Sequence, residues 1–524
     1  MTHRPNPLLS FMRGALLTLL LTAPLVASLL LAHVVLGIPF IPYDVFDLVS
    51  RSLPGSVVTS GIDAMVGILT ALGLSVRDTA KVAEQGMAVG LTLFLAMIGG
   101  GLFFVFWRGR RSSLLSGSLY GLVTGAILAL VSATRPNAVP LQSLWVLLAL
   151  LVWGVGLAWV QRHTVRTMAS ATGSAERVNR RQFMVRMGGA AALITVAGAG
   201  VGSLLGRRQA EAEAATGQRW SAMNPLPNAG ATAQPVPGTR PEYTPLEQYY
   251  RIDINLTPPT IDEATWNLRV EGLLDTPKTY TLAELRTYEP VSQFITMACI
   301  SNPVGGELTS TTRWTGVPLR RLLPEWGLQP DATHLRIASV DGFFEYVALT
   351  DIENDERIML AYAWDGVPLR IRNGFPLRVY IPDHYGMKQP KWIESIEAVP
   401  AWEPGYWVRR TWDKTAQMRA TSVIDTVQMG EGEPVSIGGM AHAGARGISK
   451  VEVKVDDGPW QEAELREPIS ELTWVLWRFE WPFEEGEHTF NVRCFEGDGT
   501  PQITERRSPH PSGSTGIDGR QVTL

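Results

Sequence analysis

The sequence predicts a multi-domain protein: an N-terminal bundle of transmembrane α-helices, then a mixed α+β domain, then an immunoglobulin-like β-sandwich. Three observations support this order. Long apolar stretches fill the first two fifths of the 524-residue chain. The middle of the chain alternates short strand patterns with short helix patterns. The last part has only short strands between turn signals, at sandwich-like spacing. The predicted regions are residues 1–205, 206–243, 244–408 and 409–524.

Composition excludes some classes of function. The formal net charge is −4, so the chain lacks the basic surface typical of a nucleic-acid-binding protein. Only 2 cysteines occur, Cys299 and Cys494, which rules out a disulfide-rich framework. Cys494 falls in a predicted strand of the sandwich, where we expect a small buried side chain.

Residues 1–205 contain four clear candidates for membrane spans, each near the length of about 20 apolar residues that a bilayer requires. They are 15–36, 87–107, 114–133 and 141–160, and a shorter fifth stretch is 187–205. Residues 57–76 are also apolar, with Asp63 as their one charge, and we expect a re-entrant or interfacial helix there.

The distribution of arginines between the apolar stretches indicates how the chain is oriented in the membrane. They precede the first stretch, follow the second, and lie between the fourth and fifth. The positive-inside rule places these segments in the cytoplasm, so everything after Leu205 lies outside it. We therefore expect a multi-pass protein of the cell membrane, in contact with lipid, with a periplasmic soluble part.

Arg180 and Arg181 precede Phe183 and the fifth apolar stretch. This pattern resembles a twin-arginine export signal, although ordinary positive-inside anchors explain the same residues. Paired histidines within the spans are missing, so we expect no b-type haem and interpret the membrane part as an anchor or docking surface. Residues 206–243 are rich in Ala, Gly, Pro, Gln and Glu, which predicts a flexible linker.

The soluble part is predicted from short periodic runs. In residues 244–408 we expect strands at 265–274, 334–340, 343–349, 357–364, 375–381 and 391–399, with short helices at 281–285 and 317–323. In residues 409–524 we expect strands at 436–440, 448–455, 460–465, 472–481 and 487–495, and a mobile tail from Ser508.

Cys299 is the most distinctive residue of the soluble part. An apolar, β-prone run that includes Phe294, Ile295 and Met297 leads to it, and a loop rich in Ser, Asn, Pro, Gly and Thr follows. A thiolate in this position suits a soft or high-valent metal. The alternative is a small buried hydrophobic residue.

Several motifs follow one another in residues 249–502. They include Tyr249-Tyr250-Arg251-Ile252-Asp253, Cys299-Ile300-Ser301-Asn302, Trp314-Thr315-Gly316, Asn373-Gly374-Phe375-Pro376-Leu377-Arg378 and Tyr385-Gly386-Met387-Lys388-Gln389-Pro390-Lys391-Trp392. In this order and spacing they resemble the sulfite oxidase family of molybdopterin enzymes. The resemblance implies a molybdenum–molybdopterin cofactor with Cys299 as the thiolate ligand of the metal. Cys299 and Arg251 are then the catalytic candidates, because Arg251 is the arginine that remains to hold an oxyanion.

The resemblance also implies a cradle for the pterin and its anionic phosphate. Arginine binds phosphate through a planar fork, and lysine binds it as a point charge. The implied cofactor-binding residues are Tyr250, Arg251, Asn302, Asp341, Asn373, Arg378, Lys388, Gln389 and Lys391.

The sequence departs from the family's animal and plant members at three places. Pro303 and Val304 stand where those enzymes have arginines, Asn373 replaces a histidine, and Trp412 aligns with a catalytic tyrosine. These departures argue against sulfite and favour another, neutral substrate shaped by residues 303–312. Asn373 matches the bacterial branch that reduces protein methionine sulfoxide.

The leading hypothesis is oxygen-atom transfer on a small molecule. Its direction stays open, so a reductase of sulfoxide-type substrates is an alternative, and a metal-free binding module on a membrane anchor is another. The chain has no Cys-x-x-Cys-His motif and no cytochrome b5-like segment, so we predict no haem. Electrons must pass through a separate carrier or a quinone-linked protein. The sandwich makes dimers in sulfite oxidases, so an oligomer is compatible with the resemblance.

Overall fold

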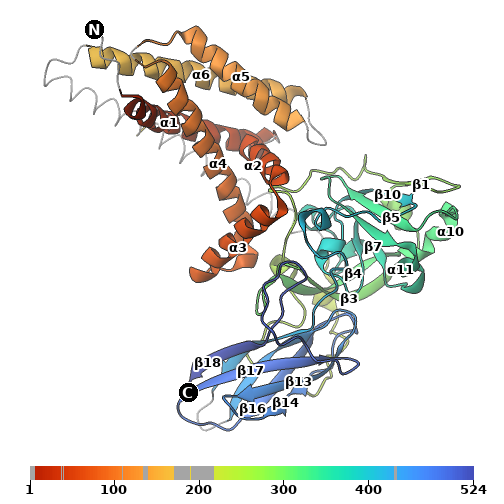
Figure 1. Cartoon of the computed structure of the whole chain (residues 1–524). Helices are drawn as coiled ribbons and strands as arrows, with labels where there is room; N and C mark the ends of the chain where they lie inside the picture. Colours follow the sequence, from red (N-terminus) through yellow and green to blue (C-terminus); the bar gives the residue numbers. More distant parts are fainter. Residues whose placement is uncertain are drawn as a thin grey trace. The chain divides into compact units, whose positions relative to one another are not determined.

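The computed structural model describes residues 6–36, 38, 40–108, 110–133, 140–169, 189, 217–429 and 434–524. The chain divides into two compact units (Figure 1). One unit combines Met1–Leu53 with Lys81–Ala215, and the other combines Pro54–Ala80 with Thr216–Leu524.

The first unit is helical. Its helices are α1 (Pro7–Leu36), α2 (Ile41–Ser52), most of α4 (Val76–Phe106), α5 (Leu114–Ala133) and α6 (Pro140–Ala169). Four segments in the described part of the chain are long and apolar enough to cross a membrane: Pro7–Leu36, Thr79–Phe106, Leu114–Ala133 and Ser143–Thr164. They correspond to the four clear spans that the sequence predicts. The predicted fifth span and the Arg180–Arg181 pair lie outside the described residues, apart from Gly189.

Helices α5 and α6 pack closely through glycine. A Cβ atom added to Gly121 would lie 2.2 Å from the carbonyl oxygen of Leu150, and one added to Gly154 would lie 2.3 Å from that of Gly117. Such contacts require residues without side chains. Small residues at helix contacts are typical of membrane bundles, where close backbone approach replaces the hydrophobic effect.

Helix α3 (Gly55–Ala71) occupies most of the stretch predicted as a re-entrant or interfacial helix. It has 17 residues, fewer than the roughly 20 that a bilayer requires. A separate short helix was therefore predicted correctly. Its interfacial position stays a prediction.

The first soluble domain contains two sheets. One has the strand order β2-β1-β10-β5-β6 and the other the order β3-β4-β7-β8, with β9 paired to β7. The strands of the first sheet are β1 (Leu268–Gly272), β2 (Lys278–Tyr280), β5 (His334–Ser339), β6 (Phe344–Ala348) and β10 (Ile393–Val399). The strands of the second are β3 (Val291–Ala298), β4 (Thr309–Pro318), β7 (Met359–Trp364), β8 (Val367–Pro368) and β9 (Arg378–Tyr380).

Short helices connect these strands. They are η1 (Leu246–Gln248), α9 (Leu282–Leu285), η2 (Leu319–Arg321), α10 (Leu323–Trp326), α11 (Leu349–Asn354), η3 (Ile371–Asn373), η4 (Gly386–Lys388) and η5 (Val408–Arg410). The helix predicted at 281–285 is confirmed as α9, and Thr281 caps it, because the Thr281 hydroxyl accepts a hydrogen bond from the Glu284 N–H at 3.2 Å. The helix predicted at 317–323 is wrong at its start, where β4 continues to Pro318 before η2 begins.

The loop after Cys299 is shorter than its composition suggests. Strand β4 already begins at Thr309, and Thr309, Ser310, Thr311 and Thr312 are all buried. Threonine is β-branched and fits a strand, although its polarity in sequence resembles a loop. The hydroxyls of Ser310, Thr311 and Thr312 have hydrogen-bond partners, as in the Thr296–Thr311 pair, whereas that of Thr309 has none in the described residues.

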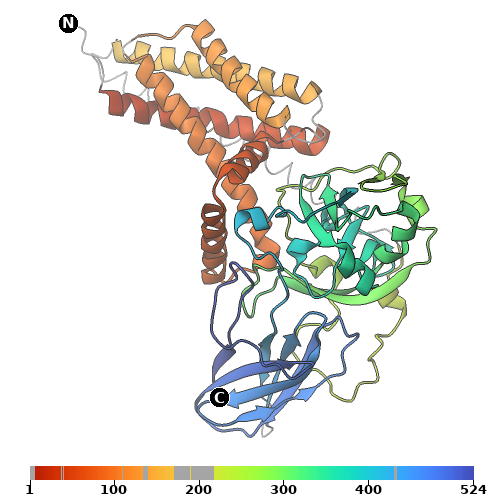
Figure 2. The ribbon, with the colours of Figure 1, turned by 45° about the vertical axis from the view of Figure 1, so that its right-hand side comes forward.

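Residues after 409 form two four-stranded sheets around a common apolar core. Their orders are β11-β12-β16-β15 and β14-β13-β17-β18. The strands are β11 (Thr421–Gln428), β12 (Val435–His442), β13 (Ile448–Val455), β14 (Trp460–Glu462), β15 (Glu464–Leu465), β16 (Val475–Trp481), β17 (Glu487–Glu496) and β18 (Asp518–Thr523), drawn in blue in Figure 2. The core joins Ile437 of one sheet to Val453 and Val492 of the other. Cys494 is completely buried there, as predicted. An immunoglobulin-like strand order stays a prediction.

The C-terminal segment is ordered, which corrects the prediction of a mobile tail from Ser508. Strand β18 pairs with β17, and Asp518 accepts a hydrogen bond from the Ile424 N–H at 2.8 Å. Strand β18 exposes most of its polar side chains at a sheet edge. Its sequence therefore lacks the apolar alternation by which strands are recognised.

Residues 217–243 form an ordered arm, in contrast to the flexible linker predicted for 206–243. Asp365 accepts hydrogen bonds from the Ser221 N–H at 2.9 Å and the Tyr243 hydroxyl at 2.7 Å. Further along, Glu242 binds the buried Arg466 of the sandwich at 2.9 Å. Polar anchors of this kind leave no hydrophobic period in the sequence. Residues 206–216 lie outside the described part of the chain.

Candidate functional site

Cys299 follows the last residue of β3 and begins a loop that closes on itself. Its N–H donates to the Leu308 carbonyl at 2.9 Å, and its own carbonyl accepts from the Asn302 N–H at 3.0 Å. The Asn302 side-chain oxygen accepts from the Leu308 N–H at 2.9 Å. We call residues 299–308 the cysteine loop. Its backbone holds the thiol in one place at the end of the sheet.

The Cys299 thiol is buried, and only 8% of the residue is exposed. Burial raises the pKa of the thiol, while hydrogen bonds from Ser301 act in the opposite direction. Its sulfur lies 3.0 Å from the Ser301 hydroxyl oxygen. A buried thiol of this kind is inert by itself, and a metal ion is the partner that would favour its thiolate form.

Tyr249 and Tyr250 connect the thiol to a group of cations. Their rings stack with centroids 5.6 Å apart, and both belong to the apolar cluster that contains Cys299 and Trp314. The Tyr250 N–H donates to the Ser310 hydroxyl at 3.1 Å. The Arg378 guanidinium lies over the Trp314 ring, 4.8 Å from its centroid. The sulfur and the first cation therefore contact the same aromatic group.

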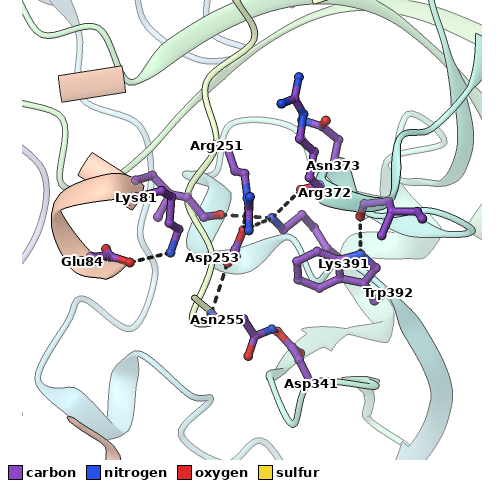
Figure 3. Close-up of polar contacts among 12 residues, drawn as sticks. Lys81, Glu84, Arg251, Asp253, Asn255, Asp341, Arg372, Asn373, Lys391 and Trp392 are labelled. Atoms are coloured by element: carbon purple, nitrogen blue, oxygen red, sulfur yellow. Dashed lines mark hydrogen bonds and ion pairs between the residues drawn. The ribbon is translucent and has the colours of Figure 1, made fainter. Parts of the chain in front are cut away.

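The cations are arranged around one carboxylate (Figure 3). Arg251 Nε donates to Asp253 Oδ2 at 2.8 Å, and Lys391 Nζ lies 3.2 Å from the same oxygen. Arg378 Nη1 donates to the Asn373 carbonyl at 3.1 Å, and the backbone of Arg378 pairs with that of Lys391. We call these five residues the cation cradle. Arg251 and Lys391 share Asp253, and Arg378 adds a third cation, so positive charge exceeds negative charge within the cradle.

Burial makes this excess charge costly. Burial lowers the pKa of Lys391 to about 8, Arg251 and Arg378 lower it further, and Asp253 opposes the shift. Burial also lowers the pKa of Arg378, which is 6% exposed. Buried charges without partners are unfavourable, so an anion bound between these residues would relieve the repulsion.

Polar atoms without partners line the same region. Arg251 Nη2, Asn373 Oδ1 and Gln389 Oε1 are buried and have no hydrogen-bond partner within the described chain. Arg251 and Asn373 thus add a donor and an acceptor to the cradle, and Gln389, two residues before Lys391 in the chain, has a further acceptor. Buried polar groups are normally satisfied, so these atoms indicate a missing polar ligand. A pterin with an anionic phosphate has complementary groups.

Asp341 stands at the turn after β5, beside the cradle in Figure 3. Asn255 Nδ2 donates to its Oδ2 at 2.7 Å, and the Phe343 N–H donates to its Oδ1 at 3.0 Å. Asp341 is thus a buried, fixed acceptor. Its role toward a pterin stays a prediction.

Two other predicted cofactor residues have protein partners. Lys388 Nζ lies 2.8 Å from Glu345 Oε1, and Glu345 is completely buried. Burial raises the pKa of the Glu345 carboxyl, and Lys388 opposes that shift. The charge of Lys388 is therefore already compensated. Asn302 uses its side-chain oxygen to close the cysteine loop.

The predicted substrate region is partly occupied by the protein itself. Val304 packs against a cluster of the sandwich that includes Met440 and Trp474. Trp412 is buried in an apolar cluster with Tyr385 and with Ala298, the residue before Cys299. Its indole nitrogen has no hydrogen-bond partner in the described residues. The cysteine loop contains no arginine, so it offers no guanidinium group to a substrate.

Comparison with known proteins supports the interpretation. The family profile of the oxidoreductase molybdopterin binding domain matches residues 255–407. Mitochondrial sulfite oxidase of Macaca fascicularis is 26% identical over 294 residues, covering 46% of this chain and 53% of the relative. Residues 255–407 therefore match a molybdopterin-binding oxidoreductase domain, and the chain is similar to sulfite oxidases.

Two further proteins are similar to this chain, one in sequence and one in fold. A putative protein-methionine-sulfoxide reductase subunit YedZ1 of Azospira oryzae is 28% identical over 148 residues, covering 28% of this chain and 54% of the relative. The sulfane dehydrogenase SoxCD of Paracoccus pantotrophus has a similar fold, with a TM-score of 0.50 and 19% identity over 58% of this chain and 87% of its own. The chain spans about half the length of the first of its curated relatives.

The match to a molybdopterin-binding domain implies a molybdopterin cofactor, and the residues of this structure fit it. The cradle supplies cations for an anion, and the unpartnered atoms supply donors and acceptors. Cys299 supplies a sulfur at the end of the same aromatic group. Arg251 lies before the matched segment, yet Asp253 links it to Lys391 within that segment.

Sequence reasoning missed three residues that shape the site. Asp253 joins the cations, Ser301 contacts the sulfur, and Glu345 neutralises Lys388. Asp253 follows Arg251 by two positions, which in an extended chain puts both on one side. That spacing was a usable signal. Nothing in the local sequence indicates the Glu345 pairing, because 43 residues and several elements separate the partners along the chain.

Proposed function

We propose that this chain is a membrane-anchored molybdenum-cofactor oxidoreductase that transfers an oxygen atom to or from a small substrate outside the cytoplasm. One observation carries the proposal. A buried thiol, Cys299, belongs to the same apolar cluster as Tyr249, Tyr250 and Trp314, and Arg378 of the cradle lies over the Trp314 ring. A cofactor that combines a thiolate-bound metal with an anionic organic part would use both the thiol and the cation cradle.

The chain's residues have distinct tasks toward this group. When bound, the cofactor supplies a redox metal that exchanges an oxygen atom and two electrons with a substrate. Cys299 provides the protein's sulfur, and Arg378 and Lys391 hold the anionic part. Arg251 keeps one buried N–H free to orient either the cofactor or a substrate oxygen. The aromatic group keeps water away from the sulfur.

The substrate that we propose is small and neutral. Pro303 and Val304 stand where the sulfite-using members carry arginines, and Val304 is used in packing. An anionic substrate would therefore meet fewer cations. A reductase of sulfoxide-type substrates is the second candidate, supported by Asn373 and by the similarity to the putative protein-methionine-sulfoxide reductase subunit of Azospira oryzae.

The anchor and the electron partner follow from the first unit of the chain. Four apolar helices support attachment to the membrane. The arginine distribution supports an extracytoplasmic catalytic part. Electrons would pass to or from a separate carrier or a quinone-linked protein, because we found no haem motif in the sequence.

The test is a redox screen with an artificial electron mediator. Full-length protein from a cofactor-competent host is assayed with sulfite, sulfoxides and other small oxygen donors and acceptors, beside Cys299→Ala. We expect activity in the wild type that the variant loses, with sulfoxide turnover above sulfite turnover. Purified wild type without molybdenum contradicts the proposal and favours a metal-free binding module.

A further inference from the structure

The Ser301 hydroxyl is placed against the Cys299 sulfur. The two atoms lie 3.0 Å apart, within hydrogen-bond distance for sulfur. The hydroxyl of Ser301 is therefore positioned to share a hydrogen bond with the sulfur.

The direction of the side-chain bond follows from chemistry. In a free thiol either atom can donate. A thiolate bound to a metal has no proton, so only the Ser301 hydroxyl can then donate. Hydrogen bonds to an ionised acceptor are also stronger than neutral ones. The contact should therefore strengthen when a metal binds.

The loop keeps Ser301 in this position from both sides. The Asn302 N–H donates back to the Cys299 carbonyl at 3.0 Å, which folds the chain over Ser301. Ser514 of the C-terminal segment donates to the Asn302 carbonyl at 2.7 Å. Rigid outer groups that hold a metal ligand typically tune the metal as well as orient the ligand.

We propose that Ser301 is a positioning residue that sets the redox potential of the metal bound by Cys299, by donating a hydrogen bond to the thiolate. The inference rests on the proposed function. A hydrogen bond withdraws electron density from the sulfur and so favours the reduced metal. Hydrogen bonds to sulfur ligands are one of the ways in which proteins set metal potentials.

The test compares Ser301→Ala with wild type by redox titration of the molybdenum centre in the full-length holoenzyme, followed by electron paramagnetic resonance of its paramagnetic state. We expect a more negative potential in the variant. A tenfold change in the reduced-to-oxidised ratio at a given poise corresponds to about 59 mV for a one-electron couple, and this is the shift expected. We also expect altered g-values, which a change in loop stability alone does not produce.

Ser514→Ala is the matched control. It removes a hydroxyl that holds the same loop but does not contact the sulfur. We expect its potential and g-values to equal those of the wild type. Ser301→Thr keeps the hydroxyl and should restore the wild-type potential. If Ser301→Ala does not retain metal, Ser301→Cys, with a weaker donor, should give a smaller shift in the same direction.

The outcomes separate this inference from the proposed function. Wild-type protein without molybdenum overturns both. Molybdenum present in every protein, with the same potential and spectrum in Ser301→Ala as in wild type, overturns the role of Ser301 alone. An equal shift in Ser514→Ala also overturns it, because loop stability would then explain the effect.

Discussion

The cysteine loop and the cation cradle belong to one candidate site but differ in whether their polar groups have partners within the protein. The loop satisfies its own polar groups, through the Asn302–Leu308 and Cys299–Leu308 hydrogen bonds. The cradle leaves Arg251 Nη2 and Asn373 Oδ1 without partners and gathers more positive than negative charge. The loop is therefore complete without a ligand, whereas the cradle is complete only with an anion. The predictions below exploit this difference.

The largest effect is expected at the sulfur. Cys299→Ser should abolish oxygen-atom transfer, with a loss of more than about 100-fold, because removing a direct ligand exceeds the 10–100-fold cost of losing an outer partner. The protein should still retain the organic cofactor, since the cradle is intact. Metal analysis and pterin fluorescence of the purified protein measure the two separately.

Cys494→Ala is the control for that experiment. Cys494 is the other buried cysteine, and it lies in the sandwich core rather than in the site. Its molybdenum content should equal that of the wild type. A variant at Cys299 that keeps full activity would contradict the assignment of the metal ligand.

The next largest effect distinguishes the roles of two buried arginines, Arg466 and Arg378, by the change in the free energy of unfolding. Arg466 pairs with Glu242, so Arg466→Met should lower the free energy of unfolding by about 3–5 kcal/mol. Arg378 donates to the Asn373 carbonyl and forms no ion pair with a carboxylate in the described residues, so Arg378→Met should stabilise the cofactor-free protein by about 1–4 kcal/mol. It should also weaken cofactor retention about 10- to 100-fold, the value of a charge-assisted hydrogen bond.

Urea denaturation of the detergent-solubilised chain and pterin content measure these two quantities. Opposite signs for stability and retention in Arg378→Met are the signature of a cradle for an anion. If Arg378→Met destabilises the protein as Arg466→Met does, Arg378 has a structural role only.

The third prediction concerns pH. The Lys391 pKa is lowered to about 8, mainly by burial, and only the protonated form attracts an anion. A phosphate monoester is already doubly charged above about pH 6. Cofactor affinity should therefore be constant below pH 8 and fall by up to about tenfold per unit above it.

Lys391→Met should remove this slope while lowering affinity at pH 7. In the cofactor-free protein, folding stability depends on pH with the opposite sign to cofactor affinity. Between pH 8 and 10.5 the unfolded chain binds more protons at Lys391 than the folded chain, so stability rises with pH. Reconstitution measured from pH 7 to 9.5 provides the check, and a pH-independent wild type would exclude Lys391 from the cradle.

The smallest effect is expected in the loop. Asn302→Ala removes one hydrogen bond to the Leu308 N–H and should cost about 1 kcal/mol of stability. Asn302→Asp keeps the acceptor and should retain the wild-type stability. Thermal unfolding of both variants tests this. If Asn302→Asp instead loses the cofactor at unchanged stability, Asn302 binds the cofactor directly.

The sequence predicted much of this site because its residues occur in short ordered motifs. Cys299 was expected at the end of a strand, and β3 ends at Ala298. Arg378 and Lys391 were expected together, and they pair through their backbones. Strands with clear alternation, such as β5 and β13, were placed within one or two residues.

What the sequence did not predict depends on distant polar partners. The arm at 217–243 is held by Asp365 and Arg466, more than 100 residues further along the chain. Lys388 is neutralised by Glu345 on β6. Such contacts carry no periodic signal. The strand at Thr309–Thr312 was missed for a different reason, because buried threonines resemble a loop by polarity alone.

The central claim is that one sulfur from Cys299 joins a cofactor that the cradle holds. X-ray absorption spectroscopy of the holoenzyme at the molybdenum edge tests it most directly. We predict three sulfur ligands in the wild type, two from the pterin and one from the protein, and two in Cys299→Ser. The same number of sulfur ligands in both proteins, or no molybdenum in the wild type, would contradict the account.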